Sequence, residues 1–257
     1  MLANIISYLC AKKFIIMAEI TSYDFIIQPQ DVDFTLRASA ASIINYMLNV
    51  AGTDAHRKGF GVDALQGHSV TWVLSRLAVE IAAQPKQYEA IQVDTWVNEF
   101  NRLSSTRNFR MRQDDNILAM GVSQWCMLDM ESRQAVDMTK LKDVYERAMV
   151  DEPSPIAMPA RLRGVEAESH SSRPVVYSDI DFNRHVNTLR YIDLMFDALP
   201  IERIENNNGM RIDINFLAEA LYGEVLTIGV ATEGDTWQFE ISSNSGKTLC
   251  RAKIEFK

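Results

Sequence analysis

The chain has 257 residues, a length between that of one large domain and two small ones. Hydrophobic residues make up 47% of it and charged residues 23%, close to the globular average, which excludes a disordered, collagen-like or coiled-coil protein. The net charge is −8, and neither the first 150 residues nor the remainder is basic, which argues against a nucleic-acid binder.

The cysteines and histidines give no sign of a disulfide framework or a metal site. Cys10, Cys126 and Cys250 are widely spaced, odd in number and include no Cys-x-x-Cys pair. The four histidines are scattered and belong to no metal-binding motif. This pattern predicts a reducing, cytoplasmic setting.

The N-terminal segment at residues 1–16 is apolar but does not have the pattern of a targeting signal. Lys12 and Lys13 interrupt it, and no small-residue cleavage site follows. The run is also too short to span a bilayer. We interpret it as an extension upstream of a start at Met17, and we expect no stable membrane anchor.

The hydrophobic periodicity predicts helices and strands in a repeating order. In the first part it predicts a strand at residues 22–28, a buried helix at 36–50, a short helix within 52–67, a further segment at 69–83, a strand at 90–99 and a strand hairpin at 106–112 and 117–128. A polar, helical and then proline-interrupted stretch follows at 129–158, and an irregular segment at 161–174. The second part has a predicted helix at 191–199 and strands at 211–216, 225–232, 237–242 and 249–256.

The two parts of the chain share an element order, one helix followed by strands. Residues 32–39 align with residues 180–187 at an offset of 148, and the Asp-Phe pair is identical in both. The shared order and the alignment indicate a duplicated fold. We therefore predict an α+β protein of two domains, residues 17–150 and 175–257, joined by a linker at residues 151–174.

A dense polar group lies just before the second predicted helix. Asp181, Asn183 and His185 alternate with other residues, so an extended or turning segment places their side chains on one side. An imidazole beside a carboxylate is suited to act as a general base, and free N–H groups at a helix N-terminus can stabilise an oxyanion. The alternative is structural: Asp181 or Asn183 caps the helix, and His185 is a partly buried side chain.

Three segments carry a resemblance to one enzyme family. Residues 180–191 are similar to the signature Asn-x-His-Val-Asn-Asn-x-x-Tyr, and residues 91–97 and 214–220 resemble two further stretches, the second of which carries a catalytic glutamate. The family is the acyl-acyl-carrier-protein (acyl-ACP) thioesterases of plant plastids and many bacteria. The resemblance implies a tandem hot-dog fold, in which each repeat is a long helix wrapped by an antiparallel sheet. It also implies hydrolysis of fatty acyl-ACP thioesters without a metal or dissociable cofactor.

The resemblance also implies which residues act. The family's aspartate, asparagine, histidine and glutamate fall on Asp181, Asn183, His185 and Glu219. Two routes fit them: Asp181 attacks the thioester carbonyl, or Glu219 and His185 activate a water. The cysteine that follows the glutamate in plant members is Ala220 here, so we expect no cysteine nucleophile. The second of the signature's two consecutive asparagines is Thr188 here, after Asn187.

The first repeat lacks this set of residues. Thr35 and Arg37 occupy the positions of Asn183 and His185, and Gln84 falls near the aligned glutamate. The resemblance implies that this repeat shapes the acyl pocket instead. The candidate pocket residues are Met47, Leu48, Trp72, Leu74 and Trp96, although residues of these types are more often ordinary core.

Other functions fit the same pattern in part. An acyl-CoA thioesterase on this fold would use the same four residues. A catalytically silent acyl-binding protein predicts a broken polar set in both repeats, whereas here only the first is broken. A hot-dog dehydratase would not explain Asn183 and Glu219 together.

The implied partner, an acyl carrier protein bearing a fatty acyl phosphopantetheine, is strongly acidic, so an acidic enzyme needs a local basic surface. Two groups are candidates: Arg102, Arg107, Arg110 and Arg112, or Arg184 and Arg190 beside the signature. The alternative for the first group is a charged, solvated strand edge. A monomer and a homodimer are both compatible with a tandem chain.

Overall fold

The computed structural model describes residues 18–65, 69–141, 145–146 and 148–257 of the chain. The apolar segment at residues 1–16, with Cys10, lies outside the described residues. No helix within the described part is long and apolar enough to cross a membrane. Below, the first half is residues 18–150, the crossing segment is residues 151–168 and the second half is residues 169–257.

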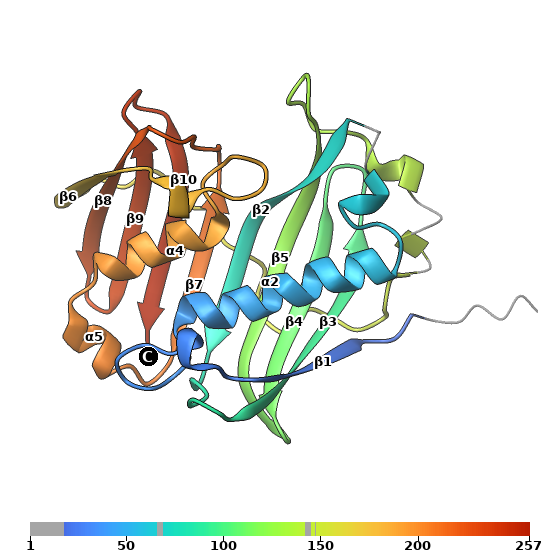
Figure 1. Ribbon diagram of the computed structural model, residues 1–257, viewed down its shortest axis with the longest axis horizontal. Coiled ribbons are helices and arrows are strands. Elements are labelled where there is room, and N and C mark those ends of the chain that lie inside the picture. The colour runs from blue at the N-terminus through green and yellow to red at the C-terminus, as the bar shows by residue number, and fades with distance from the viewer. Residues whose placement is uncertain (1–17, 66–68, 142–144, 147) are drawn as a thin grey trace, which may run out of the picture.

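The strands of the described residues form one antiparallel sheet (Figure 1). They are β1 Thr21–Ile26, β2 Val70–Ile81, β3 Ala90–Phe100, β4 Ser105–Gln113, β5 Asn116–Asp129, β6 Ser169–Pro174, β7 Met210–Phe216, β8 Val225–Glu233, β9 Thr236–Ser243 and β10 Thr248–Phe256. Their order is β1-β3-β4-β5-β2-β7-β10-β9-β8-β6. The second five strands repeat the order of the first five in reverse, so the halves meet at β2 and β7 as two copies of one arrangement.

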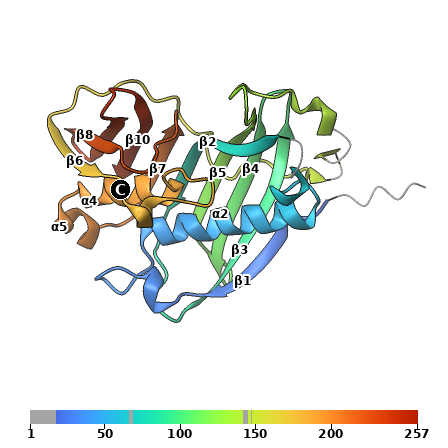
Figure 2. The same ribbon diagram turned by 45° about the horizontal axis from the view of Figure 1, so that its top comes forward.

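Two long helices lie on the same face of this sheet, one over each half (Figures 1 and 2). They are α2 Ala40–Arg57 and α4 Thr188–Asp197; the shorter elements are α5 Ile201–Glu205 and the 3-10 turns Pro29–Asp31, Asp63–Leu65, Met138–Leu141 and Tyr177–Asp179. Side chains cap both long helices. Ser39 Oγ accepts from the Ser42 N–H at 3.1 Å, and Asn187 Oδ1 accepts from the Leu189 N–H at 2.9 Å. Each cap stabilises its helix by about 1 kcal/mol.

One apolar core runs beneath both helices. It contains Ile43 and Met47 of α2 and Ile192 and Met195 of α4, all fully buried, together with apolar side chains from strands of both halves. Six residue pairs of β2 and β7, from Arg76–Asn215 to Ile81–Met210, join the halves into one sheet. The halves therefore bury apolar surface against each other as well as within themselves.

Most of the predicted elements are confirmed, and their ends differ by a few residues. The first long helix begins later than predicted, because a turn takes up residues 33–36 and Ser39 caps the helix. It also continues through Gly52, which the sequence pattern treated as a break; a side chain at that position would meet no other atom within 4 Å.

Two predictions are wrong. The stretch at 129–158 is not one helical segment: its described residues hold a 3-10 turn at Met138–Leu141 and helical residues at 145–146 and 148, and much of the rest is irregular. The segment at 161–174, predicted to be irregular, ends in strand β6, which pairs with β8. β6 is an exposed edge strand with the sequence SHSSRP, so it has no hydrophobic alternation to reveal it.

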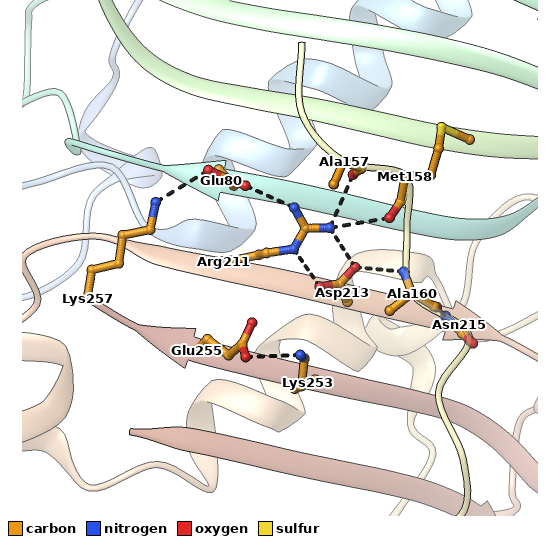
Figure 3. Close-up of polar contacts among 10 residues, drawn as sticks. All are labelled: Glu80, Ala157, Met158, Ala160, Arg211, Asp213, Asn215, Lys253, Glu255 and Lys257. Carbon is orange, nitrogen blue, oxygen red and sulfur yellow. Dashed lines mark hydrogen bonds and ion pairs between the residues drawn. The ribbon is translucent and has the colours of Figure 1, made fainter. Parts of the chain in front are cut away.

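The crossing segment lies against the face of the sheet opposite the helices (Figure 3). The buried Asp213 of β7 accepts from Arg211 Nε at 2.8 Å and from the Ala160 backbone N–H at 2.9 Å. Arg211 also donates to the Ala157 carbonyl at 3.1 Å and to Glu80 of β2 at 2.9 Å. One guanidinium thus joins both central strands and the segment that connects the halves.

We expect Asp213→Ala to lower the free energy of unfolding by about 3 kcal/mol or more, because it leaves the largely buried Arg211 without its main counter-charge. Urea denaturation followed by circular dichroism measures the change. The control is Glu255→Ala, which breaks the more exposed pair with Lys253 and should cost less than about 1 kcal/mol (Figure 3). Equal effects of the two substitutions would contradict the assigned role of Asp213.

Candidate active site

The polar group of the sequence signature forms a tight loop between the turn at Tyr177–Asp179 and α4. Asp181 Oδ1 accepts from the backbone N–H groups of Asn183 at 2.8 Å and His185 at 3.2 Å, and the Asp181 N–H donates to the His185 carbonyl at 2.8 Å. Arg184 at the turn has φ +65°, a left-handed conformation that is uncommon outside glycine. Asp181 therefore folds the loop around its own carboxylate.

A second segment brings Glu219 to the same loop. Val186 donates its N–H to the Ala220 carbonyl at 3.0 Å, and His185 forms a β-bridge with Leu221. As a result, His185 Nε2 lies 3.4 Å from Glu219 Oε2, with the two side chains 25% and 32% exposed. The positions 34 residues apart in sequence are thus neighbours in space.

Arg133, from the turn that follows β5 in the first half, forms an ion pair with the Glu219 carboxylate. No sequence motif marks this arginine. Burial lowers the pKa of His185 below its ordinary value of 6.5; the Asp181 carboxylate opposes this effect, and the Arg133 charge adds to it. The structure therefore groups Asp181, His185, Glu219 and Arg133, whereas Asn183 lies exposed at the turn, held through its backbone N–H.

The N-terminus of α4 offers fewer free donors than the sequence suggested. The Val186 N–H is bonded to Ala220, the Asn187 N–H to the Asp179 carbonyl at 2.8 Å, and the Leu189 N–H to the Asn187 side chain. Within the described residues, the Thr188 N–H is the donor of this segment without a hydrogen-bond partner. It is therefore the available oxyanion donor at this helix end.

The first half contains the same loop with other side chains. The Thr35 N–H donates to Asp33 Oδ1 at 2.8 Å, Leu36 has φ +59°, and the Ala38 N–H donates to the Pro85 carbonyl at 2.8 Å. The corresponding features of the second loop are the Asn183 N–H bond to Asp181, the positive φ of Arg184 and the Val186 N–H bond to the Ala220 carbonyl. Arg37 consequently takes the place of His185, and its Nη1 donates to the carbonyl of Gln84, which takes the place of Glu219.

Two open pockets on the described part of the chain lie away from Asp181, Asn183, His185 and Glu219. One, of about 410 Å³, lies at the altered loop and is lined by Thr35, Arg37 and Gln84 together with residues 204–205 and 207–209 of the second half. The other, of about 640 Å³, runs along the β1–β3 edge. The candidate acyl-pocket residues line neither cavity: Met47, Leu74 and Trp96 are buried, and Leu48 and Trp72 pack against the cores.

The described cysteines are poorly suited to act as nucleophiles. Cys250 is fully buried, and burial raises the pKa of its thiol. Burial also raises the pKa of the Cys126 thiol. A thiol with a raised pKa supplies little thiolate at neutral pH.

The arginines at 102–112 do not form a free basic surface. Arg107 is buried and pairs with Asp54 at 2.7 Å, and Arg110 and Arg112 both pair with the buried Asp94, at 2.9 and 3.3 Å. Arg102 lies 3.8 Å from Asp137. The charged-edge alternative is also wrong, because β4 lies between β3 and β5 inside the sheet. By contrast, Arg184 is exposed, and Arg190 pairs with Asp193 at 2.7 Å.

Comparison with known proteins identifies relatives along nearly the whole chain. The family model described as the acyl-ACP thioesterase N-terminal domain matches residues 19–147, and that of the C-terminal domain matches residues 163–257. An acyl-ACP thioesterase of Bacteroides thetaiotaomicron with a known crystal structure is 33% identical, and the match covers 93% of this chain and 98% of that one with a TM-score of 0.84.

More distant relatives come from plants. The 12:0-ACP thioesterase of Umbellularia californica shares the fold, with a TM-score of 0.82 over 93% of this chain and 97% of that one at 19% identity. The chloroplastic oleoyl-acyl carrier protein thioesterase of Coriandrum sativum is 22% identical over 231 residues, which cover 82% of this chain and 62% of the relative. The matches span 60–66% of the first three curated relatives. The chain belongs to the acyl-ACP thioesterase family.

Proposed function

We propose that this protein hydrolyses fatty acyl thioesters carried on acyl carrier protein, releasing a free fatty acid and the carrier thiol. The observation that carries the proposal is the placement of His185 Nε2 3.4 Å from Glu219 Oε2, in a partly exposed site beside the N-terminus of α4. The family assignment and the 33% identity to an acyl-ACP thioesterase over nearly its full length support it.

We further propose that the chain is a tandem of two hot-dog domains, with the boundaries expected from the sequence at residues 17–150 and 175–257 and a linker at residues 151–174. The strand β6 lies in this expected linker but pairs with β8, so the second domain begins at residue 169 and the linker ends at residue 168. The mirrored strand order, the single long helix over each half and the matching loops support this division. The two matched family models also divide the chain in this region, the first ending at residue 147 and the second beginning at residue 163. Only the second domain would carry the chemistry, because the first has Arg37 and Gln84 at the positions of the histidine and glutamate.

The geometry favours activation of a water over attack by Asp181. Asp181 Oδ1 already accepts two backbone N–H groups, which weakens the carboxylate as a nucleophile. Glu219 faces one ring nitrogen of His185 and so fixes its tautomer, and the other nitrogen takes the proton of the attacking water. The water oxygen bonds to the thioester carbon, and the Thr188 N–H stabilises the oxyanion. The C–S bond then breaks, and the leaving thiolate takes up the proton from His185.

The acidic carrier would dock at the loop that holds the site. Arg184 is exposed at the turn of this loop, and Arg190 lies on the first turn of α4, where it pairs with Asp193. An acyl-CoA thioesterase with the same residues is the second candidate. Hydrolysis of matched acyl-CoA and acyl-ACP substrates separates the two, and we expect the higher kcat/KM with acyl-ACP.

Substitutions at His185 and Asp181 test the reacting groups. We expect His185→Ala and Asp181→Ala each to reduce kcat/KM for acyl-ACP by about 100-fold or more, the usual scale for loss of a general base or of the group that orients it. The matched control is Arg37→Ala, which changes the corresponding position of the first loop and should leave the rate within about threefold. A fully active Asp181→Ala protein would contradict the site assignment.

The Asp181→Asn variant distinguishes activation of a water from direct attack by Asp181. Asp181→Asn keeps the Oδ1 that accepts the loop N–H groups, so in the water route we expect it to retain about tenfold more activity than Asp181→Ala. If Asp181 attacks the carbonyl, both variants should be equally inactive. Rapid-quench mass spectrometry provides the independent measurement, and an acyl adduct on the peptide that contains Asp181 would overturn the water route.

The pH dependence of kcat/KM tests the role of His185 as the base. His185 can accept a proton only when unprotonated, so kcat/KM should fall as the pH drops through its pKa. Because burial lowers that pKa below 6.5, we expect activity to persist to a lower pH than an exposed histidine would allow. Initial rates on a soluble acyl thioester between pH 4.5 and 8 measure the midpoint, with circular dichroism at each pH as the control for folding. A midpoint above about 7 would be inconsistent with this environment.

A further inference from the structure

Arg133 is the only described residue of the first half that forms an ion pair with any of Asp181, Asn183, His185 and Glu219, and it pairs with Glu219. Its guanidinium contacts Glu219 Oε2, the same oxygen that faces His185 Nε2. The Arg133 side chain is 43% exposed, so the contact lies near the protein surface rather than deep in the core. Two cationic or potentially cationic groups thus compete for one carboxylate oxygen.

The sheet explains how a residue of the first half reaches this oxygen. β5 is antiparallel to β2, and β2 is antiparallel to β7, so β5 and β7 run in the same direction. The C-terminal ends of both strands therefore lie at the same end of the sheet. Arg133 follows the end of β5 at Asp129, and Glu219 follows the end of β7 at Phe216. The contact depends on the pairing of the two halves.

The turn that carries Arg133 is firmly built. Asp129 Oδ1 accepts from the Glu131 N–H at 3.1 Å and from the Ser132 N–H at 2.7 Å, and the Asp129 N–H donates to the Gln134 carbonyl at 2.9 Å. Arg133 itself is left-handed, with φ +57°, and its N–H donates to the Asp129 carbonyl at 2.9 Å. This geometry fixes the direction in which the side chain leaves the turn.

The charges around His185 come from three elements. Asp181 belongs to its own loop, Glu219 to the connection between β7 and β8, and Arg133 to the turn after β5. Both carboxylates favour the imidazolium form of His185, and Arg133 disfavours it. A Glu219 without Arg133 would be free to pair with protonated His185 and hold the base in its inactive form.

We propose that Arg133 is a positioning residue of the hydrolytic site: it holds the Glu219 carboxylate so that His185 stays unprotonated and available as the base. This inference rests on the proposed function. It also gives the first half, whose own loop has lost the histidine and glutamate, a direct part in the site of the second half.

The experiment is an NMR titration of the His185 imidazole in the full chain, with the signal assigned by its loss in His185→Gln. Arg133→Gln should raise the midpoint by about 0.5 to 1 pH unit, a shift reduced by the partial exposure of the pair. Arg133→Lys keeps the charge and should restore most of the wild-type value. Arg102→Gln removes an equal charge from an exposed pair with Asp137 and should leave the midpoint unchanged.

Kinetics on acyl-pantetheine, a thioester without the carrier protein, test the same inference at the level of rate. In Arg133→Gln the loss of kcat/KM should be about three- to tenfold at pH 6 and should shrink at pH 8. An equal loss at both pH values, or an unmoved titration midpoint, would overturn the positioning role. A wild-type protein that hydrolyses no thioester would instead overturn the proposed function, and the titration would still show whether Arg133 sets the protonation of His185.

Discussion

The pairing of β2 with β7 is the interaction on which the rest of the molecule depends. It joins two mirrored sets of strands into one sheet and allows a single apolar core to extend beneath both helices. Arg211 reinforces it, since it contacts Glu80 across the seam and the crossing segment on the outer face. Without this ladder β5 and β7 would not end at a common edge, and Arg133 would have no route to Glu219.

The duplicated loop shows which residues serve the backbone and which serve the chemistry. Asp33 and Asp181 are identical, and each accepts the N–H two residues ahead through Oδ1. The aspartate is thus needed to fold the loop even in the half that has lost the histidine. Its presence is weak evidence for a nucleophile. The difference between the halves lies in His185 against Arg37 and in the residue that faces each of them.

The fold and the site could be predicted from the sequence as far as local patterns reach. Alternation along β3, β4 and β5 marks the hairpins, and the signature marks His185, because both signals lie within a few residues. β6 could not be predicted, since an exposed edge strand held by backbone bonds needs no apolar side chains. Arg133 could not be predicted either, because its role depends on the relative direction of two strands in different halves.

The arginines at 102–112 were a poor basis for predicting a basic surface, because the sequence does not show which acidic residues they pair with in the folded protein. The residues at 102–112 include no acid, yet three of their four arginines pair with aspartates that are distant in sequence and buried, Asp54 and Asp94. These arginines are therefore already paired, Arg107 in the interior and Arg110 and Arg112 at partly exposed positions beside Asp94. In the proposed function an acidic carrier would dock elsewhere, and the exposed Arg184 lies on the loop that holds His185.

The two halves also contact each other's loops in chemically different ways. Gln84 in the first loop accepts a hydrogen bond from Asn207 of the second half at 3.3 Å, whereas Glu219 in the second loop pairs with Arg133 of the first half. A bond between two neutral amides positions side chains but does not change the protonation of a neighbour. An ion pair does both, because the two charges act on any imidazole beside them. The loss of chemistry in the first half therefore involves more than the missing histidine, since the contact that would control such a base is neutral there as well.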